Sequence, residues 1–113
     1  MSRCIFNNLA VGCWNIEGAN EKVNSVKISK LGQTFFEKTL KHFDVFYVQE
    51  THMSLDENIP ESIGYDATPH SRNVSGNNRY FGGMILYIKS SIKNGTKIGH
   101  NFDVDALEVK LLD

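Results

Sequence analysis

The sequence predicts an α+β protein, on three observations. The first half has the pattern of a strand, a helix and a strand, and the second half is rich in further strand patterns. The composition is that of an ordinary globular domain, because 41% of the 113 residues are hydrophobic and 22% are charged. The sequence contains no internal repeat, low-complexity tract or linker-like stretch. We therefore expect one continuous folding unit.

The first predicted element is a buried strand over residues 9–16. Its sequence, LAVGCWNI, places apolar side chains on both faces, as in a strand that is covered on both sides. Glu17 and Gly18 end the apolar run, and Cys13 and Trp14 are expected in the core. The segment 20–31 stays unassigned, since its apolar residues fit neither the helical nor the strand period: Val23, Val26, Ile28 and Leu31.

A helix is predicted over residues 35–42. Thr34 and Glu37 have the T-x-x-E spacing of a capping box, in which the two side chains bond backbone N–H groups reciprocally. The apolar side chains that follow form one stripe at helical spacing: Phe35, Phe36, Leu40 and Phe43.

A second buried strand is predicted over residues 44–50, whose sequence DVFYVQE is β-branched and aromatic on both faces. Since it follows the helix closely, the two strands are expected to lie in one sheet, joined by a crossover. Three later strands are predicted over residues 65–68, 84–89 and 106–112. A polar loop is expected over residues 70–79, and Asn94-Gly95 is a turn signal.

Charge and cysteine usage exclude several classes of protein. The net charge is −1 and the sequence pI is about 6.4, so no global basic field attracts nucleic acid, and any contact with a polyanion has to be local. Cys4 and Cys13 have neither a zinc-site spacing nor a disulfide framework. The N-terminus lacks the apolar length of a signal peptide or membrane span. We expect an intracellular protein, cytoplasmic or nuclear, with no membrane and no disulfide partner.

Polar side chains end both early strands, and this is where a site is predicted. Asn15 and Glu17 end the first strand, and Glu50 and His52 end the second. Residues two apart share a face of a strand, so each pair is expected on one face. If the strands are parallel neighbours, their carboxyl ends meet at one edge of the sheet, where sites form in such sheets.

The chemistry of these groups favours a hard cation. A carboxylate and an amide oxygen suit Mg²⁺, with Mn²⁺ as an alternative, held loosely while water and a substrate phosphate complete the shell. Such an ion could polarise a phosphodiester. Taken singly, each residue also has an ordinary interpretation, because a strand-end Asn is common in turns and a strand-end Glu or His is often only solvated.

Four segments, in order along the chain, resemble the endonuclease/exonuclease/phosphatase family. Residues 11–18 (VGCWNIEG) are similar to its first strand, in which a W-N-[IV]-x-G segment supplies a metal-site asparagine, here Asn15. Residues 44–52 (DVFYVQETH) are similar to the strand whose Q-E-T/H segment supplies the metal-binding glutamate, here Glu50. Residues 79–88 (RYFGGMILYI) and 105–111 (DALEVKL) resemble two later strands. The wording is nearest to the apurinic-type endonuclease domain of non-LTR retrotransposons.

The resemblance implies a four-layer α/β sandwich, two β-sheets flanked by helices, of which this chain is the N-terminal half. Residues 1–113 then form a single partial domain, truncated at the C-terminus, whose missing C-terminal half is its partner. Catalytic and metal-binding roles fall to Asn15 and Glu50, in a magnesium-dependent phosphodiester hydrolase with DNA as the favoured substrate. A loop beside the metal site is expected to contact phosphates through His70, Arg72, Asn73, Asn78 and Arg79.

The chain also departs from the family pattern. Related repair endonucleases have Asp where this chain has Glu17, so Glu17 is expected to support the metal ligands rather than bind the ion. His52 is expected to have the same supporting role. The family's catalytic Tyr, its D-x-N motif and its S-D-H motif have no counterpart in the sequence, so residues 1–113 alone are expected to be inactive. The alternatives are a phosphatase or an RNA or lipid phosphodiesterase of the same superfamily, an inactive truncated binding remnant, or a small unrelated α/β protein.

Overall fold

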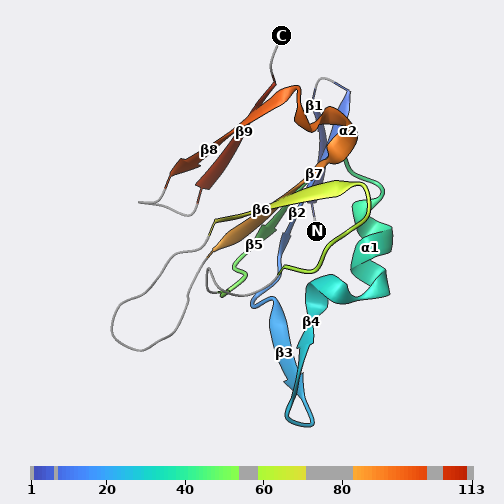
Figure 1. The fold of residues 1–113 in the computed structure, drawn as a ribbon, viewed down its shortest axis with the longest axis vertical. Coiled ribbons are helices and arrows are strands. Elements are labelled where there is room, and N and C mark those ends of the chain that lie inside the picture. Colours follow the sequence, from blue (N-terminus) through green and yellow to red (C-terminus); the bar gives the residue numbers. More distant parts are fainter. Residues whose placement is uncertain (1, 7, 54–58, 71–82, 102–105, 112–113) are drawn as a thin grey trace.

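A computed structural model describes residues 2–6, 8–53, 59–70, 83–101 and 106–111 of the chain. Its centre is a five-stranded mixed sheet (Figure 1), in which β2 and β5 are parallel and the other neighbours are antiparallel. The strand order across the sheet is β1 (Ser2–Phe6), β2 (Leu9–Asn15), β5 (Val45–Gln49), β7 (Met84–Lys89) and β6 (Tyr65–His70). The general α+β class is confirmed, as are the four predicted strands of this sheet.

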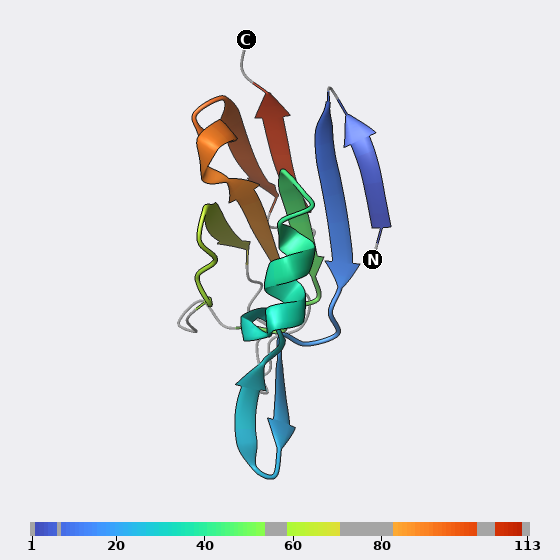
Figure 2. The same cartoon turned by 90° about the vertical axis from the view of Figure 1, so that its right-hand side faces the viewer.

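The connection between β2 and β5 contains a hairpin, a turn of 3-10 helix and the helix α1. The hairpin consists of β3 (Asn20–Val23) and β4 (Val26–Ser29), so the segment that the sequence left unassigned is largely strand. The 3-10 turn η1 (Lys30–Gly32) and α1 (Thr34–Leu40) then bring the chain back to the sheet. The hairpin projects beyond the end of the sheet at which β2 ends (Figures 1 and 2).

The predicted capping box of α1 is wrong. Thr34 is already the first helical residue, and Gln33 is the N-cap, without a hydrogen bond from its side chain to the helix. The Glu37 N–H donates to the Gln33 carbonyl at 3.2 Å, so this N–H is not available to a Thr34 cap. A helix that begins one residue earlier than the motif requires satisfies its first turn through the backbone.

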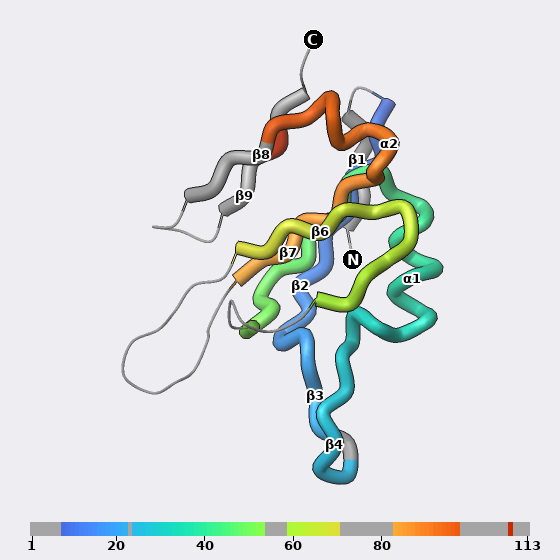
Figure 3. The backbone as a smooth tube through the Cα atoms, viewed as in Figure 1, coloured from blue at the N-terminus to red at the C-terminus, as the bar shows by residue number. Residues whose placement is uncertain are grey.

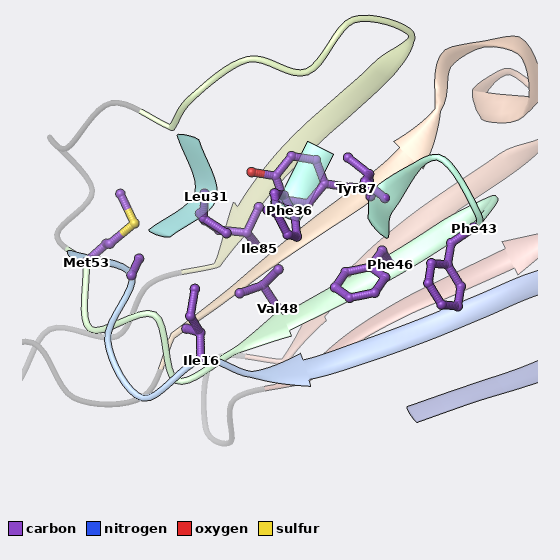
Figure 4. Close-up of a cluster of buried hydrophobic side chains, with 11 residues drawn as sticks. Ile16, Leu31, Phe36, Phe43, Phe46, Val48, Met53, Ile85 and Tyr87 are labelled. Carbon is purple, nitrogen blue, oxygen red and sulfur yellow. The ribbon is translucent and has the colours of Figure 1, made fainter. Parts of the chain in front are cut away.

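The hydrophobic core lies between α1 and one face of the sheet. Phe36 of α1 is fully buried at its centre, and its ring is 5.4 Å from the Tyr87 ring and 5.8 Å from the Phe46 ring, centroid to centroid. Trp14 is partly buried and stacks on Phe36 at 6.0 Å, so it lies at the margin of this cluster. Figure 4 shows the cluster, to which β5 contributes Phe46 and Val48 and β7 contributes Ile85 and Tyr87.

Gly12 allows the sheet and the segment after α1 to approach closely. A Cβ atom at this position would lie 2.6 Å from Phe43 Cε1 and 2.7 Å from Phe46 Cδ2. Both distances are far below van der Waals contact, so only glycine fits here without movement of the two rings.

The other face of the sheet carries a second apolar cluster, formed by Val45, Met84, Leu86 and Ile88. Ile92 of α2 (Ser90–Lys93) and Val109 of β9 (Ala106–Leu111) pack against it. β9 pairs with β8 (Thr96–Asn101) as a separate antiparallel hairpin, seen apart from the main sheet in Figure 1. The sequence predicted β9 but neither β8 nor β1.

Cys13 is a free thiol and only partly buried, so the expectation of a core cysteine holds in part. In the part of the chain that the structure describes, no helix has the length and apolar character needed to span a membrane.

Asp44 fixes the register at the amino-terminal end of β5. Its carboxylate accepts a hydrogen bond from the Ala10 N–H at 2.8 Å and lies 3.3 Å from the Lys89 ammonium group. Its backbone N–H donates to the Ala10 carbonyl at 2.8 Å. β2, β5 and β7 are thereby aligned at one end, which sets where β2 and β5 end at the other.

Candidate functional site

The parallel strands β2 and β5 end side by side. Asn15, the last residue of β2, is opposite Gln49, the last residue of β5. The prediction that these strands are neighbours joined by a crossover is confirmed. The segments that contain the predicted site residues therefore leave the sheet together, at its carboxyl-terminal edge for this pair.

Backbone hydrogen bonds keep the two segments together beyond the strands. The Ile16 N–H donates to the Gln49 carbonyl at 3.0 Å, and the Gly18 N–H donates to the Glu50 carbonyl at 2.7 Å. One step further, the Ala19 N–H donates to the Thr51 carbonyl at 2.8 Å. Glu50 is thus held against the turn that follows Asn15 by a short backbone contact.

Three of the predicted site residues have left-handed backbone conformations. The φ angles are 51° at Glu17, 54° at Glu50 and 52° at His52, and the adjacent Gly18 has a φ of 96°. For a residue with a Cβ atom this conformation costs roughly 1–2 kcal/mol. Strained backbone of this kind concentrates at functional sites, where surrounding structure holds it in place.

The same angles correct one prediction from the sequence. Asn15 and Glu17, and likewise Glu50 and His52, were expected to share a face through strand alternation. Alternation requires extended backbone, and the strands end at Asn15 and Gln49, before the left-handed residues. The directions of Glu17, Glu50 and His52 are set by these turns instead.

Exposed and buried residues alternate along both segments. Asn15, Glu17, Glu50 and His52 are exposed. The residues between and beside them are buried hydrophobic or small groups: Ile16, Gly18, Thr51 and Met53. Ile16 and Met53 extend into the core beneath α1 (Figure 4). Their burial holds the backbone of the neighbouring exposed polar residues in place.

The side chains of Asn15 and His52 both contact the turn after β2. The Asn15 Oδ1 atom accepts a hydrogen bond from the Glu17 N–H at 3.3 Å. The His52 ring lies beside Gly18, since a Cβ atom there would be 3.6 Å from His52 Nδ1. Asn15 therefore presents its amide oxygen toward the site turn, and a longer residue than glycine at position 18 would meet the histidine ring.

The Asn15 amide and the Glu50 carboxylate are oxygen donors of the type that hard cations such as Mg²⁺ prefer. The Glu50 carboxylate is exposed, and the described residues give it neither a hydrogen bond nor an ion pair. No three His, Cys, Asp or Glu side chains among the described residues are close enough together to hold one ion. An ion at this place would take the Asn15 amide oxygen, the Glu50 carboxylate and mostly water or phosphate, which is the coordination that Mg²⁺ accepts.

The predicted phosphate-contacting loop needs one correction. His70 is not a loop residue, because it is the last residue of β6, opposite Met84, and only 2% of its surface is exposed. β6 continues two residues beyond the predicted strand end, through Pro69, which brings His70 into the sheet. Arg72, Asn73, Asn78 and Arg79 lie outside the described residues.

Two features of the site were missed from the sequence. The Thr51 hydroxyl, between Glu50 and His52, is buried and has no hydrogen-bond partner among the residues that the structure describes. Lys30, from the segment without a clear period, donates from Nζ to the Ile16 carbonyl at 3.0 Å. The sequence pattern indicates neither feature, because Thr51 lies beyond the end of β5 between left-handed residues and Lys30 lies in a segment without a clear period.

Comparison of the chain with family models, with curated proteins and with solved structures gives no match in any of the three. The arrangement of residues at the ends of β2 and β5 therefore carries the functional argument together with the sequence motifs.

Proposed function

We propose that the chain carries the metal-holding part of a magnesium-dependent phosphodiester hydrolase of the endonuclease/exonuclease/phosphatase type, with DNA as substrate. One observation supports this most strongly. An exposed amide ends one of two adjacent parallel strands and an exposed carboxylate follows the other, at the positions where the sequence resembles the family's metal-site motifs. The finer fold, a four-layer sandwich, belongs to the same proposal.

In this proposal Asn15 and Glu50 bind the cation. The ion, when bound, lowers the barrier by neutralising charge on the phosphate. The Glu17 N–H orients the Asn15 amide, and the Gly18 N–H holds the Glu50 backbone in its left-handed turn. Preorganised ligands of this kind avoid reorganisation during the reaction.

The sequence motifs offer no residue that orients the attacking water. General-base assistance contributes typically about 10² to 10⁴ in rate, and site residues that act together leave little turnover when several are missing. We therefore expect metal binding by residues 1–113 without robust nicking of DNA. Metal binding, rather than cleavage, is the property to measure on this chain.

The test uses Mn²⁺, which takes the same oxygen ligands and broadens the NMR signals of nuclei close to it. Substoichiometric Mn²⁺ should broaden the backbone amides of residues 15–18 and 49–52 before all others. Glu50→Gln removes one ligand charge at nearly constant volume, and it should abolish this selective broadening. Glu37→Gln, at an exposed carboxylate on α1, is the matched control and should leave it unchanged.

Broadening that is centred elsewhere, or that survives in Glu50→Gln, would show that Glu50 is not a ligand. A plasmid-nicking assay with Mg²⁺ completes the test. Robust nicking by residues 1–113 that EDTA abolishes would refute the expectation that the chain lacks the water-orienting residues. Mn²⁺ binding without nicking by any longer version of the protein would favour the inactive binding remnant.

A further inference from the structure

We propose that the β3–β4 hairpin is a nucleic-acid-binding arm, which holds the phosphate backbone of duplex DNA beside the Asn15/Glu50 site through Lys22 and Lys27. This inference rests on the proposed function for the choice of polyanion. Four observations support it: the face that the two lysines share, the tight loop of the hairpin, the attachment of its base, and its position relative to the site.

The two lysines lie directly opposite each other. In the antiparallel register Lys22 is paired with Lys27, and Asn20 with Ser29 is the other pair on the same face. Glu21 is opposite Ile28 on the other face, so no acidic residue of the hairpin shares the lysine face. Opposite side chains have Cβ atoms about 4.5–5.5 Å apart, so the two ammonium groups are close enough to reach one phosphate backbone.

The strands of the hairpin are joined by a tight loop. Asn24 and Ser25 form its two-residue loop, and their φ angles are 51° and 67°. A loop with both central residues at positive φ matches the twist of the flanking strands. The exposed lysines are thereby presented on a defined surface and not on a flexible loop.

The base of the arm is bonded to the site itself. The Lys30 N–H donates to the Ala19 carbonyl at 2.7 Å, and the Ala19 N–H donates to the Thr51 carbonyl at 2.8 Å. The Lys30 Nζ atom also donates to the Ile16 carbonyl at 3.0 Å. These bonds connect the hairpin to the residues next to Asn15 and Glu50, so the orientation of the arm and that of the site are coupled.

The arm extends in the direction in which β2 leaves the sheet, as the tube in Figure 3 shows. At about 3.3 Å per residue, Lys22 stands roughly 7–10 Å from the base of the hairpin. That distance corresponds to about two or three base pairs of B-DNA at 3.4 Å per step. Residues 20–30 contain three lysines and one glutamate, whereas the whole chain has a net charge of −1. The arm is therefore a local basic surface, which a chain without a global positive charge requires in order to bind a polyanion.

The experiment measures binding of residues 1–113 to a short labelled DNA duplex by fluorescence anisotropy, in EDTA, between about 50 and 200 mM salt. Each lysine–phosphate contact contributes about 0.9 to the slope of log affinity against log salt. The variant Lys22→Gln/Lys27→Gln loses two contacts, so the magnitude of its slope should be smaller by about 1.8. The ratio of wild-type to variant affinity should therefore be about tenfold smaller at about 200 mM salt than at about 50 mM. The control Lys38→Gln/Lys41→Gln removes the same charge from exposed residues at the end of α1 and should leave the slope unchanged.

Lys22→Arg/Lys27→Arg keeps both charges and should retain the wild-type slope, while circular dichroism verifies that every variant is folded. The proposal would be overturned if the wild type and the arm variant had equal slopes, or if the slope of the α1 control fell as much as that of the arm variant. It would also be overturned if the wild type showed no measurable binding. The DNA-binding assay contains EDTA and no free metal, and the Mn²⁺ experiment contains no DNA. A negative result in the first therefore counts against the arm, and a negative result in the second counts against the metal site.

Discussion

The core beneath α1 and the loops after β2 and β5 hold their residues in place by different interactions. In the core, Phe36, Phe46 and Tyr87 are fully buried and pack edge to face, so apolar contact determines their positions. In the loops, Asn15 and Glu50 are exposed, and left-handed backbone at neighbouring positions is held by hydrogen bonds between the two segments. Packing in the core therefore stabilises the fold, whereas the left-handed, strained backbone lies in the loops that follow β2 and β5.

Truncating the centre of the core should have the largest effect on stability. Phe36→Ala removes a ring that contacts Trp14, Phe46 and Tyr87, and we expect a loss of about 3–5 kcal/mol in the free energy of unfolding. Urea denaturation measures it. Phe35→Ala is the control, because 63% of the Phe35 surface is exposed, and it should change stability by less than about 0.5 kcal/mol. Similar losses for both variants would show that α1 does not pack on the sheet through Phe36.

The hydroxyl groups of two tyrosines provide a finer test. The Tyr87 hydroxyl is buried and has no hydrogen-bond partner in the described part of the chain, whereas the Tyr65 hydroxyl lies 2.8 Å from the Leu40 carbonyl and 2.7 Å from the Phe43 carbonyl. Tyr87→Phe should therefore raise the free energy of unfolding by about 1 kcal/mol, and Tyr65→Phe should lower it by about the same amount. Thermal unfolding of both variants checks the two signs. A destabilising Tyr87→Phe would show that this hydroxyl has a partner.

Alkaline pH should act on the same residues. Burial raises the pKa of Tyr87 above its ordinary value of 10.0, and burial followed by the charge of Asp44 raises the pKa of Tyr65. Below pH 10 both groups are protonated in the folded and unfolded states, so their full contribution to the free energy of unfolding is present. Above pH 10 the unfolded chain releases protons that the folded chain retains, and stability falls as pH rises. Tyr87→Phe should flatten this decline in urea titrations above pH 10, and an unchanged slope would contradict the assignment.

Relieving the strain in the loops should have the smallest effect. Glu17→Gly removes the Cβ atom from a residue with a φ of 51°, and we expect a gain of about 0.5 kcal/mol after the greater entropy of the unfolded chain is included. Glu37→Gly, in the regular backbone of α1, should lower stability by about 1 kcal/mol. Denaturant titration of the pair tests the sign of each effect. Equal losses at both positions would show that Glu17 is not strained.

Local patterns were sufficient to predict three central strands of the sheet. β7 is predicted with its observed bounds, and β2 and β5 to within one residue, because their apolar residues determine the strands. β5 and β7 are largely buried, whereas most residues of β2 are only partly buried, so the predicted burial of residues 9–16 holds in part. The placement of the ends of β2 and β5 side by side, at Asn15 and Gln49, also follows from the sequence, through the order of strand, helix and strand. Patterns failed for β3 and β4, whose hairpin projects from the sheet and therefore lacks a buried face to impose a period.

The sequence by itself determined the central strands, the helix between β2 and β5, and the positions of Asn15 and Glu50 at the strand ends. Each of these depends on the spacing of apolar residues over a few turns or on the order of elements. Only the tertiary structure decided the left-handed turns at Glu17, Glu50 and His52, the burial of His70, and the attachment of the hairpin through Ala19 and Lys30. These features depend on hydrogen bonds and packing between segments far apart in the chain, so no local pattern of residue types contains them.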